Sequence, residues 1–547
     1  MTDLERWMKR YQVTPEKLEI AHQILADVRT GRPVMEAIRA YPLPQGGYLA
    51  KSMLVAEYKR QIEDGEEETD YSLLERIRMK PVRSLSGVTT VTVLTKPYPC
   101  PGKCIFCPDD VRMPKSYLVD EPGAARAFQN NFDPYQQVKS RLDSLKAVGH
   151  PTDKIELLIL GGTWSSYRKD YQQEFIKRCF DAMNEVDSQT LLEAQMINES
   201  APHRNVGLVI ETRPDEITPK ELAWLRTLGV TKVQMGVQSL DDEILAMNKR
   251  GHTVAQALQA TALLRAAGFK IVLHWMPNLL GATLTSDRVD FLRLWSGGFS
   301  PDEIKIYPCQ LLEGTELYAH WQQGEYQPYT QEELIQLIAD IKPGIQPYCR
   351  VNRVIRDIPS HHVVAGNRRT SLRQDVFAEL KKRGQRCDCI RCNEVSNQKV
   401  DPATIILQDY VYHPRTAEEH FLNYRTPDNK IAGYLRLSLP RDEEVSHPAA
   451  DLAFRDLEKA ALIREIHVYG QSLAVGAEKD GAAQHIGLGK ELIEEASRIA
   501  LENGYQNLAV IAAIGTRQYY EARGFQRGEL YMVRKLKGNQ QADSVHE

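Results

Sequence analysis

Three cysteines in one short loop give this sequence its clearest chemical signal. The loop reads Cys100-Pro-Gly-Lys-Cys104-Ile-Phe-Cys107 and follows an apolar run, Val88–Leu94. Three thiolates at this Cys-x3-Cys-x2-Cys spacing can each bind one corner of a 4Fe-4S cubane and leave the fourth iron open. A zinc loop is the alternative, but structural zinc takes four protein ligands, and no fourth Cys or His lies close in sequence.

The spacing of this loop, the aromatic Phe106 before its last cysteine and the preceding strand resemble the radical S-adenosylmethionine superfamily. The resemblance implies that the open iron chelates S-adenosylmethionine, whose reductive cleavage yields a 5'-deoxyadenosyl radical, and that Phe106 lies against the adenine. Other polar or glycine positions fall where later strands should end, and glycine there lets the backbone approach a ligand. We expect these cofactor contacts at Gly161, Gly162, Glu211, Arg213 and Gln234.

A second loop, Gln484–Lys490, opens an amphipathic helix predicted at Leu488–Glu502. Glycines at a helix start expose backbone N–H groups, and this positive end attracts a pyrophosphate. The order of strand, glycine loop, helix, strand and tyrosine-bearing helix resembles the GNAT acetyltransferase fold, which implies acetyl-CoA between two splayed strands. The contacts expected for acetyl-CoA are Glu465, Ile466, His467, Val468, Gln484, Gly487, Leu488, Gly489 and Lys490. Tyr520 is expected to face the CoA sulfur, whereas a core role for Tyr519 is equally well supported.

A third group of cysteines, Cys387, Cys389 and Cys392, places three thiols within six residues. Such crowding favours a metal, and we predict a structural zinc with a fourth ligand from elsewhere in the chain. The predicted fourth ligand is Cys309, and Cys349, His361 or His362 could take its place. A reduced cysteine cluster that relays electrons is the rival interpretation.

The elements that must position these residues alternate between short strands and helices over about 85–310. This alternation indicates a parallel sheet, and six such units predict a partial (β/α)6 barrel with ligands at the carboxyl ends of its strands. The fold class is therefore α/β, a partial barrel followed by a GNAT-type domain. The predicted units are a helical region (1–75), the barrel (76–348), a basic cysteine-containing connector (349–400), the acetyl-CoA domain (401–537) and a flexible tail (538–547).

Composition sets the wider limits. The 547 residues are 42% hydrophobic, no run approaches the ~20 apolar residues of a membrane span, and the N-terminus lacks the apolar core of a signal peptide. We expect a soluble cytoplasmic protein whose nine cysteines serve metals rather than disulfides. The net charge of -4 does not indicate a nucleic-acid partner. However, residues 350–391 hold eleven Lys or Arg and four Asp or Glu, a local +7 that predicts contact with RNA phosphates.

With these pieces in order, the chain resembles the family of Elongator catalytic subunits. The strings that carry the resemblance lie between about 75 and 537 and include Lys80–Gly87, Phe132–Tyr135, Glu211–Asp215, Gly236–Ser239, Arg356–Pro359, His467–Gly470 and Gly515–Arg517. The resemblance implies carboxymethylation at carbon five of the wobble uridine, position 34 of tRNA: the radical takes hydrogen from the acetyl methyl, the carbon adds to the uracil, and the thioester is hydrolysed. It also implies that Lys154 contacts acetyl-CoA. Many members space the first two cluster cysteines nine residues apart, whereas here the gap is three.

Two other functions remain open at this point. A protein lysine acetyltransferase would use the iron domain as a scaffold and Glu465 as its base. A non-catalytic tRNA-binding protein would retain both domains as relics, which the intact motifs oppose. The sequence does not decide between stand-alone action and Elongator-type partner subunits.

Overall fold

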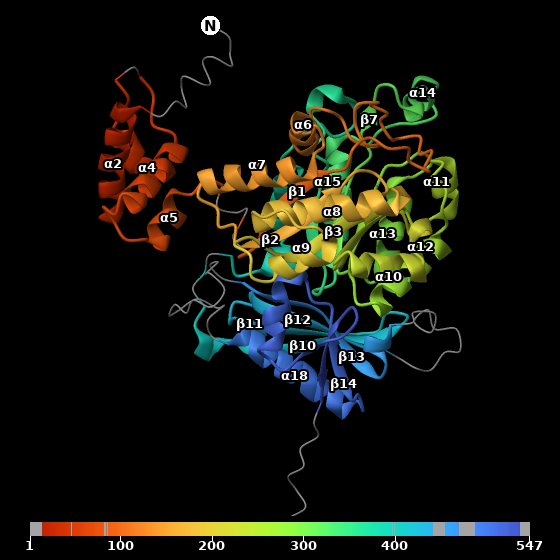
Figure 1. The fold of residues 1–547 in the computed structure, drawn as a ribbon. Helices are drawn as coiled ribbons and strands as arrows, with labels where there is room; N and C mark the ends of the chain where they lie inside the picture. The colour runs from red at the N-terminus through yellow and green to blue at the C-terminus, as the bar shows by residue number, and fades with distance from the viewer. Residues whose placement is uncertain are drawn as a thin grey trace, which may run out of the picture.

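The computed structural model describes residues 14–536 except 45, 81–83, 85, 397, 399, 441–453 and 470–486. The predicted contact Gln484 and the predicted tail 538–547 lie outside the described residues. Three units succeed one another along the chain: a small helical unit, a large α/β unit and a second sheet (Figure 1). None of the helices in the described part of the chain has the length and apolar character that a bilayer crossing requires.

The N-terminal helices form a unit with its own hydrophobic core, set to one side of the barrel (Figure 1). Thr14 begins the first helix because its hydroxyl accepts from the Lys17 amide at 3.3 Å and Pro15 occupies the first turn. The helices of this unit are α2 (Pro15–Arg29), α3 (Val34–Ala40), α4 (Lys51–Glu63) and α5 (Tyr71–Ile77). The sequence runs Pro15–Arg29 and Ser52–Asp64 predict two helices within the helical region, and the structure has both, the second shifted by one residue.

The barrel is an open sheet of seven parallel strands in the order β1-β2-β3-β4-β5-β6-β8. Its strands are β1 (Thr89–Leu94), β2 (Lys154–Leu160), β3 (Arg204–Thr212), β4 (Lys232–Gln238), β5 (Lys270–Trp275), β6 (Glu303–Ile306) and β8 (Arg350–Arg353). The six predicted strands are present. The seventh, β8, pairs with β6 in parallel, so the predicted connector contributes a strand to the barrel and the boundary expected at 348/349 cuts through the sheet.

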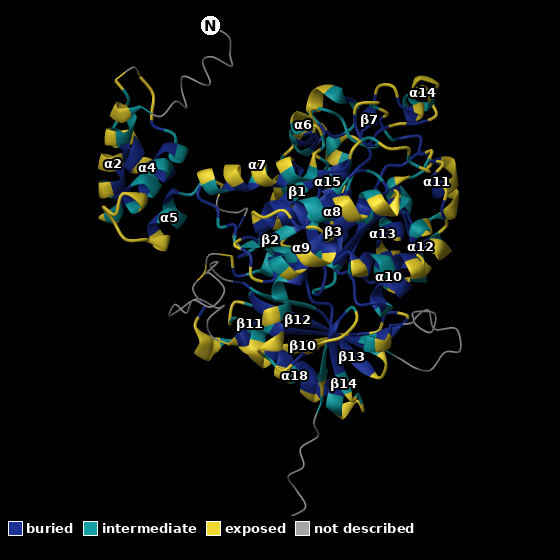
Figure 2. Ribbon diagram, viewed as in Figure 1, coloured by how far each residue is buried: buried dark blue, intermediate teal, exposed yellow. Residues whose placement is uncertain are grey.

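Helices cover the outer face of this sheet, and their exposed sides face away from it (Figure 2). They are α6 (Pro122–Gln129), α7 (Pro134–Ala147), α8 (Lys169–Asn184), α9 (Leu191–Asn198), α10 (Pro219–Thr227), α11 (Asp242–Met247), α12 (Val254–Ala266), α13 (Leu284–Ser296), α14 (Glu316–Gln322), α15 (Gln331–Ile341), α16 (Leu372–Lys382) and α17 (Ile390–Asn393). A two-stranded sheet, β7 (Leu311–Leu312) with β9 (Val363–Ala365), lies apart from the barrel sheet.

The C-terminal unit is a second seven-stranded sheet in the order β10-β11-β12-β13-β14-β16-β15. Its elements are β10 (Ile406–Tyr412), β11 (Ala417–Arg425), β12 (Ile431–Pro440), β13 (Ala460–Val468), α18 (Leu488–Glu502), β14 (Asn507–Val510), α19 (Arg517–Glu521), β15 (Gln526–Arg527) and β16 (Met532–Lys535). The parallel pairing of β13 with β14 stops at Ile463, while β13 continues to Val468. β13 therefore extends beyond the end of β14, and the splayed pair of strands that the GNAT resemblance implies stays a prediction.

The second sheet packs against the amino ends of the barrel strands, and one hydrophobic core contains residues of both units. Asp302, one residue before β6, is fully buried and receives two hydrogen bonds from Arg464 of β13, at 2.7 and 2.8 Å. Arg436 and Arg265 lie 3.4 and 3.9 Å from the same carboxylate. Gly515 fits against the β3 start so closely that a Cβ there would lie 2.8 Å from the Asn205 carbonyl oxygen. These contacts fix the two units relative to each other.

Candidate active site

One cavity of about 1370 Å³ runs along the inside of the barrel and reaches the second sheet. Its lining contains residues from both ends of the barrel strands, so we call it the passage. The lining includes Cys100, Cys104 and Cys107 after β1, Lys154, Lys232 and Lys270 at strand starts, and Gly487, Gly489 and Tyr520 of the C-terminal unit. The two loops that the sequence singled out separately therefore open into the same space.

The predicted cluster loop lies at the carboxyl end of the passage. Arg250 donates to the Cys104 sulfur at 3.4 Å, and the Gly102 amide donates to the Cys100 sulfur at 3.4 Å. Hydrogen bonding with Cys107 and the nearby Arg250 lower the pKa of Cys104 to about 5. Positive neighbours favour thiolates, which are the form that binds iron.

The arrangement of these sulfurs fits a cluster better than a single ion. Cys100, Cys104 and Cys107 are not among the described groups whose ligand atoms all lie within 4.8 Å of one another. Two sulfurs on one zinc ion lie roughly 4 Å apart, because each Zn–S bond is about 2.3 Å. A wider set of three thiolates on one wall of a large cavity suits a 4Fe-4S cubane, which would bring one-electron chemistry to this end.

The two glycines after β2 stand where a larger residue would be strained. Gly161 has a φ of +140°, and a Cβ there would lie 1.8 Å from the Thr95 hydroxyl oxygen. Gly162 lines the passage with a φ of +80°. Arg213 also lines it, held by Asp215 at 2.8 Å, and one of its guanidinium nitrogens is buried without a partner in the described structure. Phe106, Glu211 and Gln234 line the passage as well, whereas Gly161, the remaining predicted contact, is not on its lining.

The predicted acetyl-CoA loop lies at the amino end of the passage. Gly487 has a φ of +79° and caps the start of α18, whose N-terminus opens on the cavity. A Cβ on Gly489 would lie 2.5 Å from the Tyr519 hydroxyl, so a larger residue there would displace the Tyr519 side chain. Tyr519 and Tyr520 both line the passage, while the Leu488 side chain is buried in the core. The β13 residues Glu465, Ile466, His467 and Val468, and Lys490 after the glycines, line it too.

Glu465 lines the passage but is fully engaged. It accepts from Tyr434 at 2.8 Å and from Arg436 at 2.8 Å, and it pairs with Lys270. Despite the opposing effect of burial, Lys270 and Arg436 lower its pKa to about 2. A carboxylate this weakly basic is unsuited to deprotonating a lysine, which disfavours the protein-acetyltransferase interpretation.

Lys154 lies at the start of β2, on the wall of the passage that faces the C-terminal unit. Burial lowers its pKa below the usual value for lysine. The sequence alone indicates only a surface lysine at this position, so its place in the passage is information that the fold adds.

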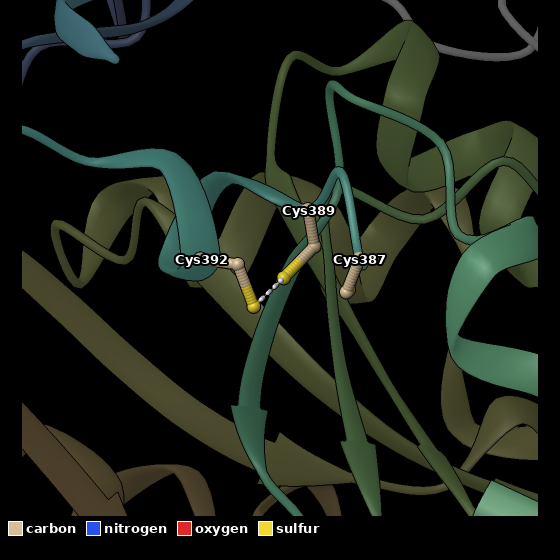
Figure 3. Close-up of side chains that lie close together, drawn as sticks. All are labelled: Cys387, Cys389 and Cys392. Carbon is tan, nitrogen blue, oxygen red and sulfur yellow. Dashed lines mark hydrogen bonds between the residues drawn. The ribbon is translucent and has the colours of Figure 1, made fainter. Parts of the chain in front are cut away.

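The sulfurs of Cys387, Cys389 and Cys392 all lie within 4.8 Å of one another, and those of Cys389 and Cys392 are 3.4 Å apart (Figure 3). The predicted fourth ligand, Cys309, is not in this group: it is buried in another cluster, with Tyr326. Cys349 is buried beside Cys389, and its carbonyl accepts from the Ile390 amide at 3.0 Å.

The two histidines that could have completed this site lie elsewhere. His361 and His362 flank Asp120, with ring nitrogens 2.9 and 2.7 Å from its carboxylate. Together these three residues form a group separate from the three cysteines. Cys349 is also outside the group of three sulfurs, but its burial beside Cys389 makes it the nearest of the candidate fourth ligands.

Several arginine side chains of the basic connector form hydrogen bonds within the protein instead of pointing into solvent. Arg350 donates to Glu394 at 2.7 Å, Arg356 to the Ser116 carbonyl at 2.6 Å, and Arg373 to the Val351 carbonyl at 3.1 Å. The side chains of Lys382 and Arg386 are 81% and 77% exposed. The expected phosphate-binding surface therefore excludes several of the arginines that suggested it.

Among the passage residues that belong to no motif of the sequence are Arg250, His274 and Lys305. Arg250 follows a short helix and stands in no recognisable string. His274 and Lys305 lie on β5 and β6. In the sequence, the only feature that could have identified them is a polar residue within an apolar strand. Such residues are costly to bury without a partner, so their presence in a strand indicates a polar cavity.

Comparisons with known proteins agree with this geometry. Residues 98–294 match the Radical SAM superfamily and residues 301–382 match the Radical_SAM C-terminal domain. The chain is 42% identical to the tRNA uridine(34) acetyltransferase of Methanocaldococcus infernus over 86% of this chain and 90% of that protein. It is 35% identical to human Elongator complex protein 3, over 85% and 87%. The solved structure of the archaeal Methanocaldococcus infernus Elp3 with an N-terminal deletion superposes with a TM-score of 0.71, at 38% identity, over 83% of this chain and all of that one.

Proposed function

Because the chain belongs to the family of tRNA uridine(34) acetyltransferases and Elongator complex protein 3, we propose that it carboxymethylates carbon five of the wobble uridine of tRNA. The carbon comes from acetyl-CoA. The observation that carries the proposal is the single passage that joins the cysteine loop to the Gly487 loop. A radical made at one end and an acetyl group held at the other can meet only where the two ends share one enclosed space.

The reaction balances without an added oxidant. Acetyl-CoA, uridine, S-adenosylmethionine and water give carboxymethyluridine, coenzyme A, 5'-deoxyadenosine, methionine and a proton. A 4Fe-4S cluster held by Cys100, Cys104 and Cys107 would supply one-electron reduction of S-adenosylmethionine, and it would regain the electron when the modified ring loses its carbon-five hydrogen as a proton.

The chain's own residues hold the two reactants. Gly487 and Gly489 expose the N-terminus of α18 to the pyrophosphate of acetyl-CoA, as at other helix starts. Tyr520, buried and with its pKa raised by burial, stays protonated and donates to the sulfur, while Lys154 contacts the acetyl-CoA from the barrel wall.

At the other end of the passage, the chain's residues would hold the cluster and S-adenosylmethionine. Arg250 stabilises the Cys104 thiolate through their hydrogen bond. Gly162, which lines the passage, lets the backbone approach the methionine end of S-adenosylmethionine, while Gly161 lets the same turn pack against Thr95.

We further propose a structural zinc bound by Cys387, Cys389, Cys392 and Cys349. It would tie α17 to the chain just before β8, the last strand of the barrel sheet. The exposed part of the connector, which includes Lys382 and Arg386, contacts tRNA phosphates.

The test is an anaerobic reaction of the reconstituted enzyme with S-adenosylmethionine, acetyl-CoA and unmodified tRNA, followed by mass analysis of nucleosides. Carboxymethyluridine and 5'-deoxyadenosine are expected together. Cys104→Ala should abolish both products, whereas Cys179→Ala, which removes a buried thiol from α8 outside the passage, should retain them. Formation of acetylated lysine by the Cys104→Ala variant, with no modified nucleoside from the parent enzyme, would support a protein acetyltransferase instead.

A further inference from the structure

The middle of the passage contains four polar side chains, one from each of four adjacent strands. They are Glu211 of β3, Gln234 of β4, His274 of β5 and Lys305 of β6, and we call them the central polar layer. Gln234, His274 and Lys305 are each less than 9% exposed. Several buried polar groups together are costly in free energy unless their hydrogen bonds are satisfied. The contacts within the layer therefore show which donors or acceptors a ligand would have to supply.

The hydrogen bonds of the layer fix the orientation of its amide and its imidazole. The Gln234 side-chain oxygen accepts from Lys305, which can only donate, so the oxygen and nitrogen of this amide are assigned. The same oxygen lies 3.1 Å from Nε2 of His274, which must therefore carry the hydrogen. Burial, with Lys305 and nearby arginines, holds the pKa of His274 well below its usual value, so the ring is neutral and its Nδ1 is an acceptor.

Two acceptors consequently face each other across the layer. Nδ1 of His274 lies 3.6 Å from Oε1 of Glu211, whose other oxygen accepts from the Tyr117 hydroxyl at 2.9 Å. A single N–H group placed between Nδ1 and Oε1 would satisfy both atoms. Lys305 is an ammonium with three hydrogens, only one of which is needed by Gln234, and it adds a donor beside this acceptor pair.

The position of the layer matches that of the third reactant. Along β4, the seven residues from Lys232 to Gln238 span about 20 Å, at about 3.3 Å per residue. Gln234 is the third residue of β4, while Glu211 and His274 stand near the carboxyl ends of β3 and β5, so the layer lies between the acetyl end and the cluster end. The radical from the cluster end must first act on the acetyl carbon, and the acceptor must then receive that carbon. The acceptor therefore has to lie between the acetyl end and the cluster end of the passage.

We propose that the central polar layer is the binding site for the acceptor base and recognises the imide edge of a uracil. The ring N–H donates to His274 and Glu211, and Lys305 donates to a flanking carbonyl oxygen. This inference rests on the proposed function, because it assumes that a tRNA base enters the passage. Cytosine would present a bare ring nitrogen to the two acceptors, so we expect discrimination of at least about 100-fold against it.

Chemical protection tests this site without loaded cofactors. A water-soluble carbodiimide reacts at the ring N–H of unpaired uridine, so it probes the very group that the layer is proposed to bind. With the protein in saturating excess over tRNA, the parent protein should protect uridine 34 from the reagent by about 10-fold or more. Lys305→Met should lose that protection, and Lys305→Arg, which keeps a donor, should retain part of it. Lys139→Met, on the exposed side of α7, is the matched control and should protect like the parent.

Protection that is equal in the parent and in a folded, tRNA-binding Lys305→Met variant would overturn the assignment. So would bound tRNA whose uridine 34 stays fully reactive on the parent protein. Either result would leave the proposed function standing if the parent still makes carboxymethyluridine from S-adenosylmethionine and acetyl-CoA. Absence of that product, with protection observed, would instead overturn the proposed function and leave the base site intact.

Discussion

Replacing Asp302 by asparagine should weaken the contact between the two sheets more than expected for so small a change in the side chain. Among the carboxylates of the interface, Asp302 contacts all three buried guanidiniums, those of Arg464, Arg436 and Arg265, at 2.7, 3.4 and 3.9 Å. An asparagine keeps the shape but removes the charge and turns one acceptor into a donor against Arg464. Breaking a buried pair in this way costs about 3–5 kcal/mol, because a charge remains buried without compensation.

The sign of the pH dependence follows from the same contacts. Arg464 and Arg436 hold the pKa of Asp302 well below its ordinary value, against the effect of burial. The stabilisation is therefore complete above the unfolded-state pKa of about 4 and is lost as the pH falls below it. The Asp302→Asn variant should lack this part of the acid sensitivity.

The assay is urea unfolding at neutral pH, monitored separately by tryptophan fluorescence and by limited proteolysis between the two units. Asp340→Asn is the matched control: Asp340 also contacts two arginines, at 2.6 and 2.7 Å, but on the exposed side of α15. Its loss should cost at most about 1 kcal/mol. If Asp302→Asn were no more destabilised than Asp340→Asn, the interface network would not be what fixes the two units.

Three further predictions concern single sites. Gly161→Ala should abolish S-adenosylmethionine binding by the reconstituted enzyme, measured by equilibrium titration, whereas Gly314→Ala, at a φ of +74° with open space around it, should not. Cys349→Ser should lower the zinc content measured by atomic emission, whereas Cys309→Ser should leave it unchanged; the reverse result would restore Cys309 as the ligand. Burial raises the pKa of Asp287 to about 7, so folding takes up a proton there and stability should fall between about pH 4 and 7, by up to about 4 kcal/mol. Asp287→Asn should flatten this slope in denaturant midpoints at pH 5 and pH 8, and an unchanged slope would count against the assignment.

Local patterns in the sequence predict the main elements well. The helix at Pro15–Arg29 is found with the predicted bounds, because a hydroxyl cap and a proline define its start. The six predicted barrel strands are apolar runs bounded by turns, which is the signal that buried parallel strands leave. The sequence does not reveal β8, because three of the four residues of Arg350–Arg353 are polar, and these three line the charged passage.

Functional residues can be predicted from the sequence where they stand together in one short segment. They cannot be predicted where the fold brings them together from separate strands. The cysteine loop and the glycine loop each stand in one short segment. By contrast, Lys305, His274 and Gln234 come from three strands and meet only when the sheet curves. Sequence position alone favours Cys309 over Cys349, because it does not report that α17 lies beside β8.

The most direct test of the account is the transfer of hydrogen between the two ends of the passage. Acetyl-CoA deuterated on its methyl group would be turned over anaerobically with S-adenosylmethionine and tRNA. The 5'-deoxyadenosine formed would then be analysed by mass spectrometry. If the acetyl group bound near Gly487 reaches the radical formed near Cys104, the 5'-deoxyadenosine should carry one deuterium. Unlabelled 5'-deoxyadenosine, formed in step with carboxymethyluridine, would contradict a shared passage as the place of reaction.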